Sequence, residues 1–174
     1  MIIVVMGLSG SGKSFLASIL HEYFGFEWIR SDQVRKELAG VAPTQRLKLP
    51  YGEGIYTEEW TRRVYEEMVR RAKQKEWKNI VLDATFLEGW QRELVRKNFP
   101  NAVFILAQAE EEEILKRLKS RQDISDADIE IYLRQKEKFS PPDYAIRINT
   151  QKTLEELRVE LEQLLQSYGY RNTP

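Results

Sequence analysis

The sequence predicts an α/β domain built on a parallel sheet, and three observations support this prediction. Short apolar segments alternate with segments of helical periodicity along the whole chain. The 174 residues are enough for one domain with a substantial core, and no internal repeat or linker divides them. A glycine-rich turn joins the first apolar segment to the first helical one. We therefore expect a single domain over residues 1–174.

The first part of the chain is expected to form strand, helix, strand and helix. A continuous apolar run, rich in β-branched residues, predicts a buried strand at Met1–Met6. A helix is predicted at Lys13–Phe24, a second strand at Phe26–Arg30 and a second helix at Ser31–Leu38. The buried face of the first helix is expected to consist of Phe15, Leu16, Ile19, Leu20 and Tyr23.

Residues 41–56 interrupt this pattern. They contain two prolines and two glycines and show no period, so we expect a long loop. Loops of this length in compact domains are often functional.

Beyond this loop the alternation resumes. The expected strands are short apolar runs at Asn79–Ala84, Asn101–Ala109 and Tyr144–Ile148. Segments with apolar residues at helical spacing predict helices from Thr57 to about Glu76, at Glu88–Asn98, from Glu110 to about Arg121, from Ser125 to the Pro141–Pro142 pair, and from Thr153 to Gly169. The expected N-terminal caps are Ser31 or Asp32, Thr57, Ser125, and Thr153 in a capping box with Glu156.

Composition excludes several classes of function. Lys and Arg number 27 and so do Asp and Glu, and this zero net charge argues against a protein that coats nucleic acid. There is no cysteine and only one histidine, which excludes thiolate and poly-histidine metal sites. No apolar run approaches the roughly 20 residues that span a bilayer. Met1–Met6 lacks the flanking features of a signal peptide, so we expect a cytoplasmic protein with no membrane partner.

Residues 7–14 read Gly-Leu-Ser-Gly-Ser-Gly-Lys-Ser and match the phosphate-loop pattern G-x-x-x-x-G-K-[ST]. Glycines let the backbone N–H groups surround a phosphate, and the following helix adds its positive end. Lys13 is expected to reach the β- and γ-phosphates, and Ser14 to supply one oxygen to Mg²⁺. The alternative is a glycine-rich turn with an exposed lysine. We expect nucleoside triphosphate binding, with ATP and Mg²⁺, through Gly7, Leu8, Ser9, Gly10, Ser11, Gly12, Lys13, Ser14 and Phe15.

Polar residues also follow the second and third strands, whose carboxyl ends should face the same crevice. Asp32 and Arg35 are three residues apart and so lie on one helical face. Asp32 could accept the proton of an attacking hydroxyl, and Arg35 could hold the anionic or hydroxylated acceptor molecule. Alternatively, Asp32 caps the helix and pairs with Arg35. Asp83 ends an apolar strand and either contacts the metal through water or orients the acceptor.

A basic cluster follows the fourth strand, at Lys116, Arg117, Lys119 and Arg121. Arg117 and Arg121 share a helical face, and mobile arginines of this kind neutralise charge on a transferred phosphoryl group, often from a lid. The alternative is a solvated charged face balanced by Glu110–Glu113.

Five segments together resemble the AAA-domain family of small P-loop kinases, which is related to the kinase domain of polynucleotide kinase and more distantly to zeta toxin, chloramphenicol phosphotransferase and gluconate kinase. The resemblance runs from Met1 to about Thr150 and rests on the phosphate loop and on residues 30–36, 82–86, 125–128 and 139–142. It implies a three-layer P-loop fold with five parallel strands in the order 2-3-1-4-5 and a helical lid at about 113–138.

The resemblance also implies roles for individual residues. Asp32 matches the general base, Arg35 an arginine that helps hold the acceptor, and Asp83 the carboxylate after the third strand. Arg117 and Arg121 match the lid arginines, one near the adenine or phosphates and one near the transferred group. The acceptor would lie beside residues 41–56.

The leading hypothesis is a Mg²⁺-dependent ATP kinase acting on a hydroxyl group, with Lys13, Asp32, Arg117 and Arg121 as its catalytic residues. A small acceptor is our first expectation because the neutral chain offers no obvious strand-binding surface, and a nucleic-acid 5′-hydroxyl is the second. A nucleotide-dependent switch module without an acceptor is the rival from another class. The sequence does not indicate the oligomeric state.

Overall fold

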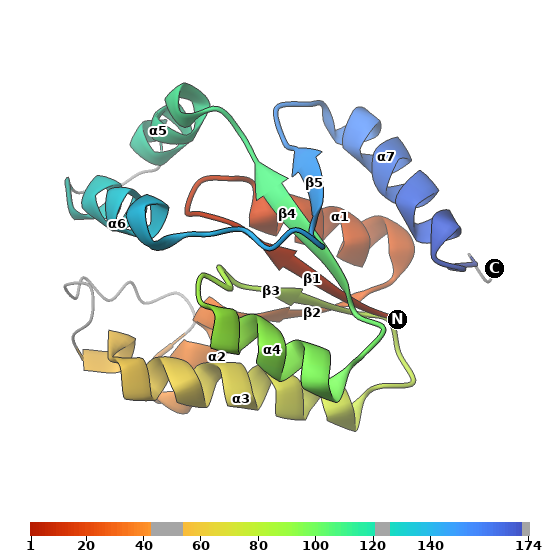
Figure 1. Ribbon diagram of the computed structural model, residues 1–174, viewed down its shortest axis with the longest axis horizontal. Coiled ribbons are helices and arrows are strands. Elements are labelled where there is room, and N and C mark those ends of the chain that lie inside the picture. The colour runs from red at the N-terminus through yellow and green to blue at the C-terminus, as the bar shows by residue number, and fades with distance from the viewer. Residues whose placement is uncertain (43–53, 121–125, 172–174) are drawn as a thin grey trace.

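A five-stranded parallel sheet lies at the centre of the computed structural model, which describes residues 1–42, 54–120 and 126–171 (Figure 1). The strand order is β2-β3-β1-β4-β5 and every neighbouring pair is parallel, which confirms the predicted topology. The strands are β1 (Ile2–Met6), β2 (Glu27–Arg30), β3 (Ile80–Asp83), β4 (Val103–Gln108) and β5 (Ile146–Asn149).

Helices cover both faces of the sheet. Helices α2, α3 and α4 lie on one face, α1 and α7 on the other, and α5 and α6 stand beyond the carboxyl ends of the strands (Figure 1). The described helices are α1 (Lys13–Phe24), α2 (Ser31–Leu38), α3 (Glu58–Gln74), α4 (Gly89–Asn98), α5 (Glu111–Ser120), α6 (Asp126–Lys138) and α7 (Leu154–Ser167), with a 3₁₀ turn η1 (Gly54–Tyr56).

Strand β1 shows how the two faces are filled. Val4 and Met6 contribute to the core under α2–α4, whereas Ile3 and Val5 contribute to the core under α1 and α7. This alternation follows from the two-residue period of a strand. Full burial of each such side chain stabilises the fold by roughly 1.5–3 kcal/mol, so β1 anchors the turn that follows it.

The buried face of α1 differs from the prediction. Phe15 and Tyr23 are 41% and 46% exposed, and Ala17 and Phe24 are buried in their place. The buried residues of the helix are Leu16, Ala17, Ile19, Leu20 and Phe24. Apolar spacing alone could not separate these two orientations.

The helix caps are partly as predicted. Thr57 accepts a hydrogen bond from the Trp60 N–H (3.3 Å) and Thr153 one from the Glu156 N–H (3.2 Å). Neither Ser31 nor Asp32 caps α2, because the helix starts directly from β2 and its extended N-cap, Arg30, makes no side-chain capping bond. The predicted cap Ser125 lies outside the described residues. A capping box between Glu88 and Gln91, which we did not predict, starts α4.

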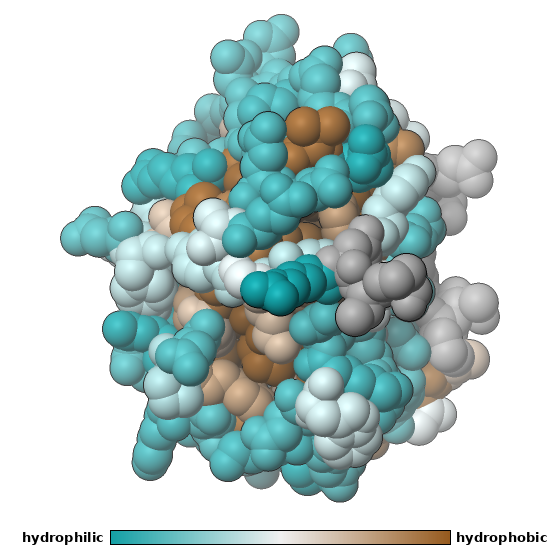
Figure 2. Space-filling model, turned by 90° about the vertical axis from the view of Figure 1, so that its right-hand side faces the viewer, coloured by the Kyte–Doolittle hydropathy of each residue, from teal (hydrophilic) through white to brown (hydrophobic). Residues whose placement is uncertain are grey.

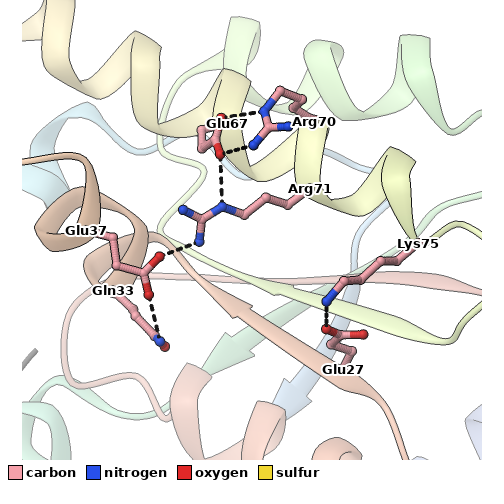
Figure 3. Close-up of polar contacts among 7 residues, drawn as sticks. All are labelled: Glu27, Gln33, Glu37, Glu67, Arg70, Arg71 and Lys75. Carbon is pink, nitrogen blue, oxygen red and sulfur yellow. Dashed lines mark hydrogen bonds and ion pairs between the residues drawn. The ribbon is translucent and has the colours of Figure 1, made fainter.

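An ion-pair network joins α2 to α3 (Figure 3). Glu67 accepts hydrogen bonds from Arg70 and from Arg71 Nε (3.0 Å), and Arg71 Nη1 also reaches Glu37 of α2 at 2.6 Å. The bonds from Arg70 and Arg71 outweigh partial desolvation and lower the pKa of Glu67 to about 2. The network fixes α2, the helix that carries Asp32, against its neighbour.

This low pKa predicts an acid-sensitive contribution to stability. Because the folded pKa of about 2 lies below the unfolded value of 4.5, the contribution is complete above pH 4.5 and disappears as the pH falls toward 2. Solvent screening limits it to roughly 1 kcal/mol. Glu67→Gln should lower the free energy of unfolding in urea by about that amount at pH 7 and by much less at pH 3. Equal losses at both pH values would contradict the ion-pair origin.

The end of the molecule that carries both termini is shown in Figure 2. Hydrophilic side chains cover most of this face, and apolar side chains show between them in separate areas. Within the described ranges, none of the helices is both long and apolar enough to cross a membrane. The polar side chains discussed below lie at the opposite end, where the strands finish.

Candidate active site

The glycine-rich turn links β1 to α1 and is packed tightly from outside. Gly12 has φ +97°, and a Cβ atom placed there would lie 2.7 Å from the side chain of Thr150. A Cβ at Gly10, whose φ is +77°, would lie 3.0 Å from Ile114 of α5. Both glycines are therefore required by the backbone conformation and by contacts behind the loop.

Lys13 bends back over this turn. Its Nζ atom donates a hydrogen bond to the Leu8 carbonyl at 3.1 Å. Beside it opens a pocket of about 330 Å³ that is lined by Gly10, Gly12, Lys13, Ser14, Phe15, Arg117, Thr150 and Lys152. The exposed Phe15 ring, misplaced in the predicted core, thus belongs to the wall of this pocket.

Ser14, in the first turn of α1, meets Asp83, the last residue of β3. The Ser14 hydroxyl donates to Asp83 Oδ2 at 3.0 Å, and the carboxylate is only 4% exposed. Trp28 Nε1 donates to the same oxygen at 3.1 Å, and Arg30 Nε lies 3.9 Å from it. Hydroxyl and carboxylate oxygens are ligand types that Mg²⁺ accepts. The pair therefore brings together two oxygen-bearing side chains that could hold a metal ion.

Asp32 and Arg35 occupy α2 as predicted but do not pair directly with each other. Asp32 is 57% exposed and lies 3.3 Å from Lys36 Nζ. Arg35 Nη1 donates to the Ile55 carbonyl at 2.6 Å and to Thr61 Oγ1 at 3.3 Å. Burial is the main cause that lowers the pKa of Arg35. The arginine therefore connects α2 to η1 and α3. Residues 43–53, most of the expected loop 41–56, lie outside the described residues.

Arg117 of α5 contacts the glycine-rich turn directly. Its Nη1 atom donates to the Gly10 carbonyl at 3.1 Å and to Thr150 Oγ1 at 3.0 Å. The buried Thr150 hydroxyl in turn donates to the Ser11 carbonyl at 2.5 Å. Arg117 therefore lies at the pocket wall and supports the loop. Arg121, the other predicted lid arginine, lies outside the described residues.

Sequence reasoning missed four residues of this region: Trp28, Gln135, Thr150 and Lys152. Thr150 follows β5, and the rule that polar residues at strand ends form the site would have found it. Nothing in the sequence shows that the indole N–H of Trp28 faces Asp83. Gln135 lies in mid-helix, where no local pattern distinguishes it from a surface glutamine.

Solved structures of several small kinases share this fold over nearly the whole chain. A shikimate kinase from Bacteroides thetaiotaomicron matches with a TM-score of 0.71 and 16% identity, over 95% of this chain and 98% of its own. An APS kinase from Mycobacterium tuberculosis, in complex with AMPPNP and APS, gives 0.68 and 16%, over 95% and 96%. A sugar kinase from a Janibacter species gives 0.65 and 22%, over 95% and 94%. At these identities the matches show the fold.

No curated protein matches the sequence. The model of one protein family, described as "AAA domain", matches residues 2–142 and so includes every described element from β1 to α6. That span holds the glycine-rich turn and the Ser14–Asp83 pair, which agrees with the resemblance noted in the sequence. The chain belongs to the AAA domain family.

Proposed function

We propose that this protein is a Mg²⁺-dependent kinase that transfers the γ-phosphoryl group of ATP to a hydroxyl group of a small molecule. The observation that carries the proposal is the Ser14–Asp83 pair, 3.0 Å apart, placed directly beside the phosphate cradle. A switch module without an acceptor would also need the phosphate cradle, so the cradle alone does not distinguish it from a kinase. The exposed Asp32 carboxylate, next to the same strand ends, adds the group that transfer requires.

The residues present divide the work of phosphoryl transfer among them. The loop N–H groups and Lys13 bind the phosphates, and Lys13 exchanges the Leu8 carbonyl for phosphate oxygens. Ser14 and Asp83 would hold Mg²⁺, which would neutralise charge on the phosphates. Asp32 accepts the proton of the attacking hydroxyl as its oxygen bonds to the γ-phosphorus and the bond to ADP breaks.

Two further groups of residues complete the proposed site. Arg117 contacts the nucleotide in the pocket that it lines together with Lys13 and Lys152. Helices α5 and α6 belong to a lid at about residues 113–138 that carries Arg117 and Arg121. Arg35 shapes the acceptor side through its bonds to Ile55 and Thr61.

A small acceptor is supported by the zero net charge and by analogy of fold. The matching solved structures are named as kinases of sugar, shikimate and APS, all small molecules. The neutral chain gives no reason to expect the broad basic surface that a long nucleic acid needs.

Transfer from labelled ATP to a panel of sugars, nucleosides, antibiotics and 5′-hydroxyl oligonucleotides tests the proposal. We expect Mg²⁺-dependent labelling of a small hydroxylated compound by the wild type and none by Lys13→Ala. Labelling of the oligonucleotide alone would overturn the small acceptor. ATP binding without any transfer would favour the switch module.

Trp28 offers a sharp test of the metal assignment. Trp28→Phe keeps an aromatic ring but removes the N–H that holds Asp83 Oδ2 at 3.1 Å. Losing one hydrogen bond to a charged group should weaken Mg²⁺-dependent ATP binding by roughly tenfold. ATP binding without Mg²⁺ should not change, as calorimetry with and without the metal can show.

The matched control is Trp77→Phe, since Trp77 is 77% exposed. It should leave both affinities at the wild-type values. A Trp28→Phe variant whose ATP affinity depends on Mg²⁺ as in the wild type would argue that Asp83 does not serve the metal.

A further inference from the structure

Helix α6 makes a direct polar contact with the glycine-rich turn that no part of the proposed mechanism uses. The side-chain carbonyl of Gln135, Oε1, accepts a hydrogen bond from the Ser9 N–H at 3.1 Å. Gln135 is only 8% exposed, although its sequence neighbours Arg134 and Lys136 are exposed. The contact joins segments 126 residues apart and is therefore a tertiary contact.

Apolar packing next to this contact also joins α5 and α6 to the glycine-rich turn. Ile114, Leu118 and Tyr132 form a small core cluster against which Leu8 packs. This cluster holds α5 and α6 together beside Leu8 of the turn, and Gln135 of α6 reaches the same turn. Gln135 holds residue 9, while Arg117 holds the Gly10 carbonyl from α5.

The chemistry of the amide explains why glutamine suits this position. A backbone N–H can only donate, so the amide oxygen must face Ser9 and the amide NH₂ must face away from it. The N–H groups of a phosphate loop are also the donors that a polyphosphate seeks. A phosphate oxygen and Gln135 Oε1 therefore compete for the Ser9 N–H. A glutamine that loses this partner can turn and donate from Nε2 to the phosphate, whereas glutamate can only accept and lysine can only donate.

We propose that Gln135 is a nucleotide-binding residue with two states: it accepts a hydrogen bond from the Ser9 N–H when the loop is empty and donates one to the polyphosphate when the loop is occupied. The position of α6 then responds to the occupancy of the loop. This inference rests on the proposed binding of ATP by the loop and assigns no part of the chemical step to Gln135.

Two substitutions separate the two states. Gln135→Glu retains the acceptor for Ser9 but brings a negative charge to the phosphates, which should weaken ATP binding by roughly tenfold or more at short range. Gln135→Lys loses the acceptor but supplies a cation, so ATP should bind at least as tightly as to the wild type. Adenosine, which has no phosphate, should bind equally to all three proteins. Calorimetry with ATP, tripolyphosphate and adenosine measures each affinity.

Hydrogen exchange supplies a readout that a purely structural role would not produce. Without nucleotide, α6 should exchange at the wild-type rate in Gln135→Glu and faster in Gln135→Lys. With ATP, the order should reverse. Leu133→Glu is the matched control, because it adds the same charge to the same helix at a residue that is 46% exposed. It should leave the ATP affinity within about twofold of the wild type, since exposed charges are screened.

The outcomes distinguish the two proposals. If wild-type protein binds neither ATP nor tripolyphosphate, the proposed function fails at the first titration and this inference fails with it. If the wild type binds ATP but Gln135→Glu binds it equally well, only the role of Gln135 is overturned. Weakening by Gln135→Glu and Leu133→Glu to the same extent would also overturn it, because a general charge effect would then suffice.

Discussion

Asp32→Asn is expected to lower the turnover number by roughly a hundredfold or more while leaving ATP affinity unchanged. The carboxylate lies on α2, is 57% exposed and does not touch the glycine-rich turn through any described contact. Asparagine has the same shape but cannot accept the hydroxyl proton. The turnover number with the acceptor found in the panel and the dissociation constant for ATP are the two measurements required.

The control for Asp32 is its ion-pair partner. If Asp32 only stabilises α2 by pairing with Lys36, then Lys36→Met should impair the enzyme as much as Asp32→Asn does. A general base predicts a large loss for the aspartate variant alone. The thermal stability of Asp32→Asn should stay near that of the wild type, because no side-chain cap starts α2.

Gly12→Ala should weaken ATP binding by roughly a hundredfold. Two costs combine: a non-glycine residue at φ +97° is strained by about 1–2 kcal/mol, and the new Cβ, 2.7 Å from Thr150, adds roughly 1–3 kcal/mol of overpacking. Relief requires Thr150 or the turn to move, and either movement disturbs the N–H groups that should surround the phosphate. Calorimetric titration with ATP checks the prediction.

Gly169→Ala separates the two costs. Gly169 has φ +84°, close to the value at Gly12, but nothing lies within 4 Å of an added Cβ. It should therefore lower the melting temperature through strain alone and leave ATP binding intact. Equal losses of thermal stability in the two variants would show that the contact with Thr150 costs nothing.

The fold was largely predictable from the sequence because its signals are local. The β-branched run of β1 and the helical period of α3 determine their elements without reference to partners. The strand order came from the family resemblance. The sequence did not determine which face of α1 is buried, because Phe15, Ile19 and Tyr23 also recur at helical spacing although Phe15 and Tyr23 are exposed.

The residues of the candidate site were predictable where they belong to a sequence motif or follow a strand, and less so elsewhere. The phosphate-loop pattern and the end of β3 together pointed to Ser14 and Asp83, which the structure places in contact. Residues such as Trp28 and Gln135 contact partners distant in sequence, so only the assembled tertiary structure brings them to the candidate site.

The bond from Thr150 to the Ser11 carbonyl has a consequence for how the protein is made. It joins residues 139 apart, so the glycine-rich turn lacks this part of its support until β5 has left the ribosome and added to the sheet. Contacts between residues so distant in sequence form late in folding because a large loop must close first. Competence to bind nucleotide should therefore arrive among the last properties of the nascent chain, long after the amino-terminal segment that carries the motif has been synthesised.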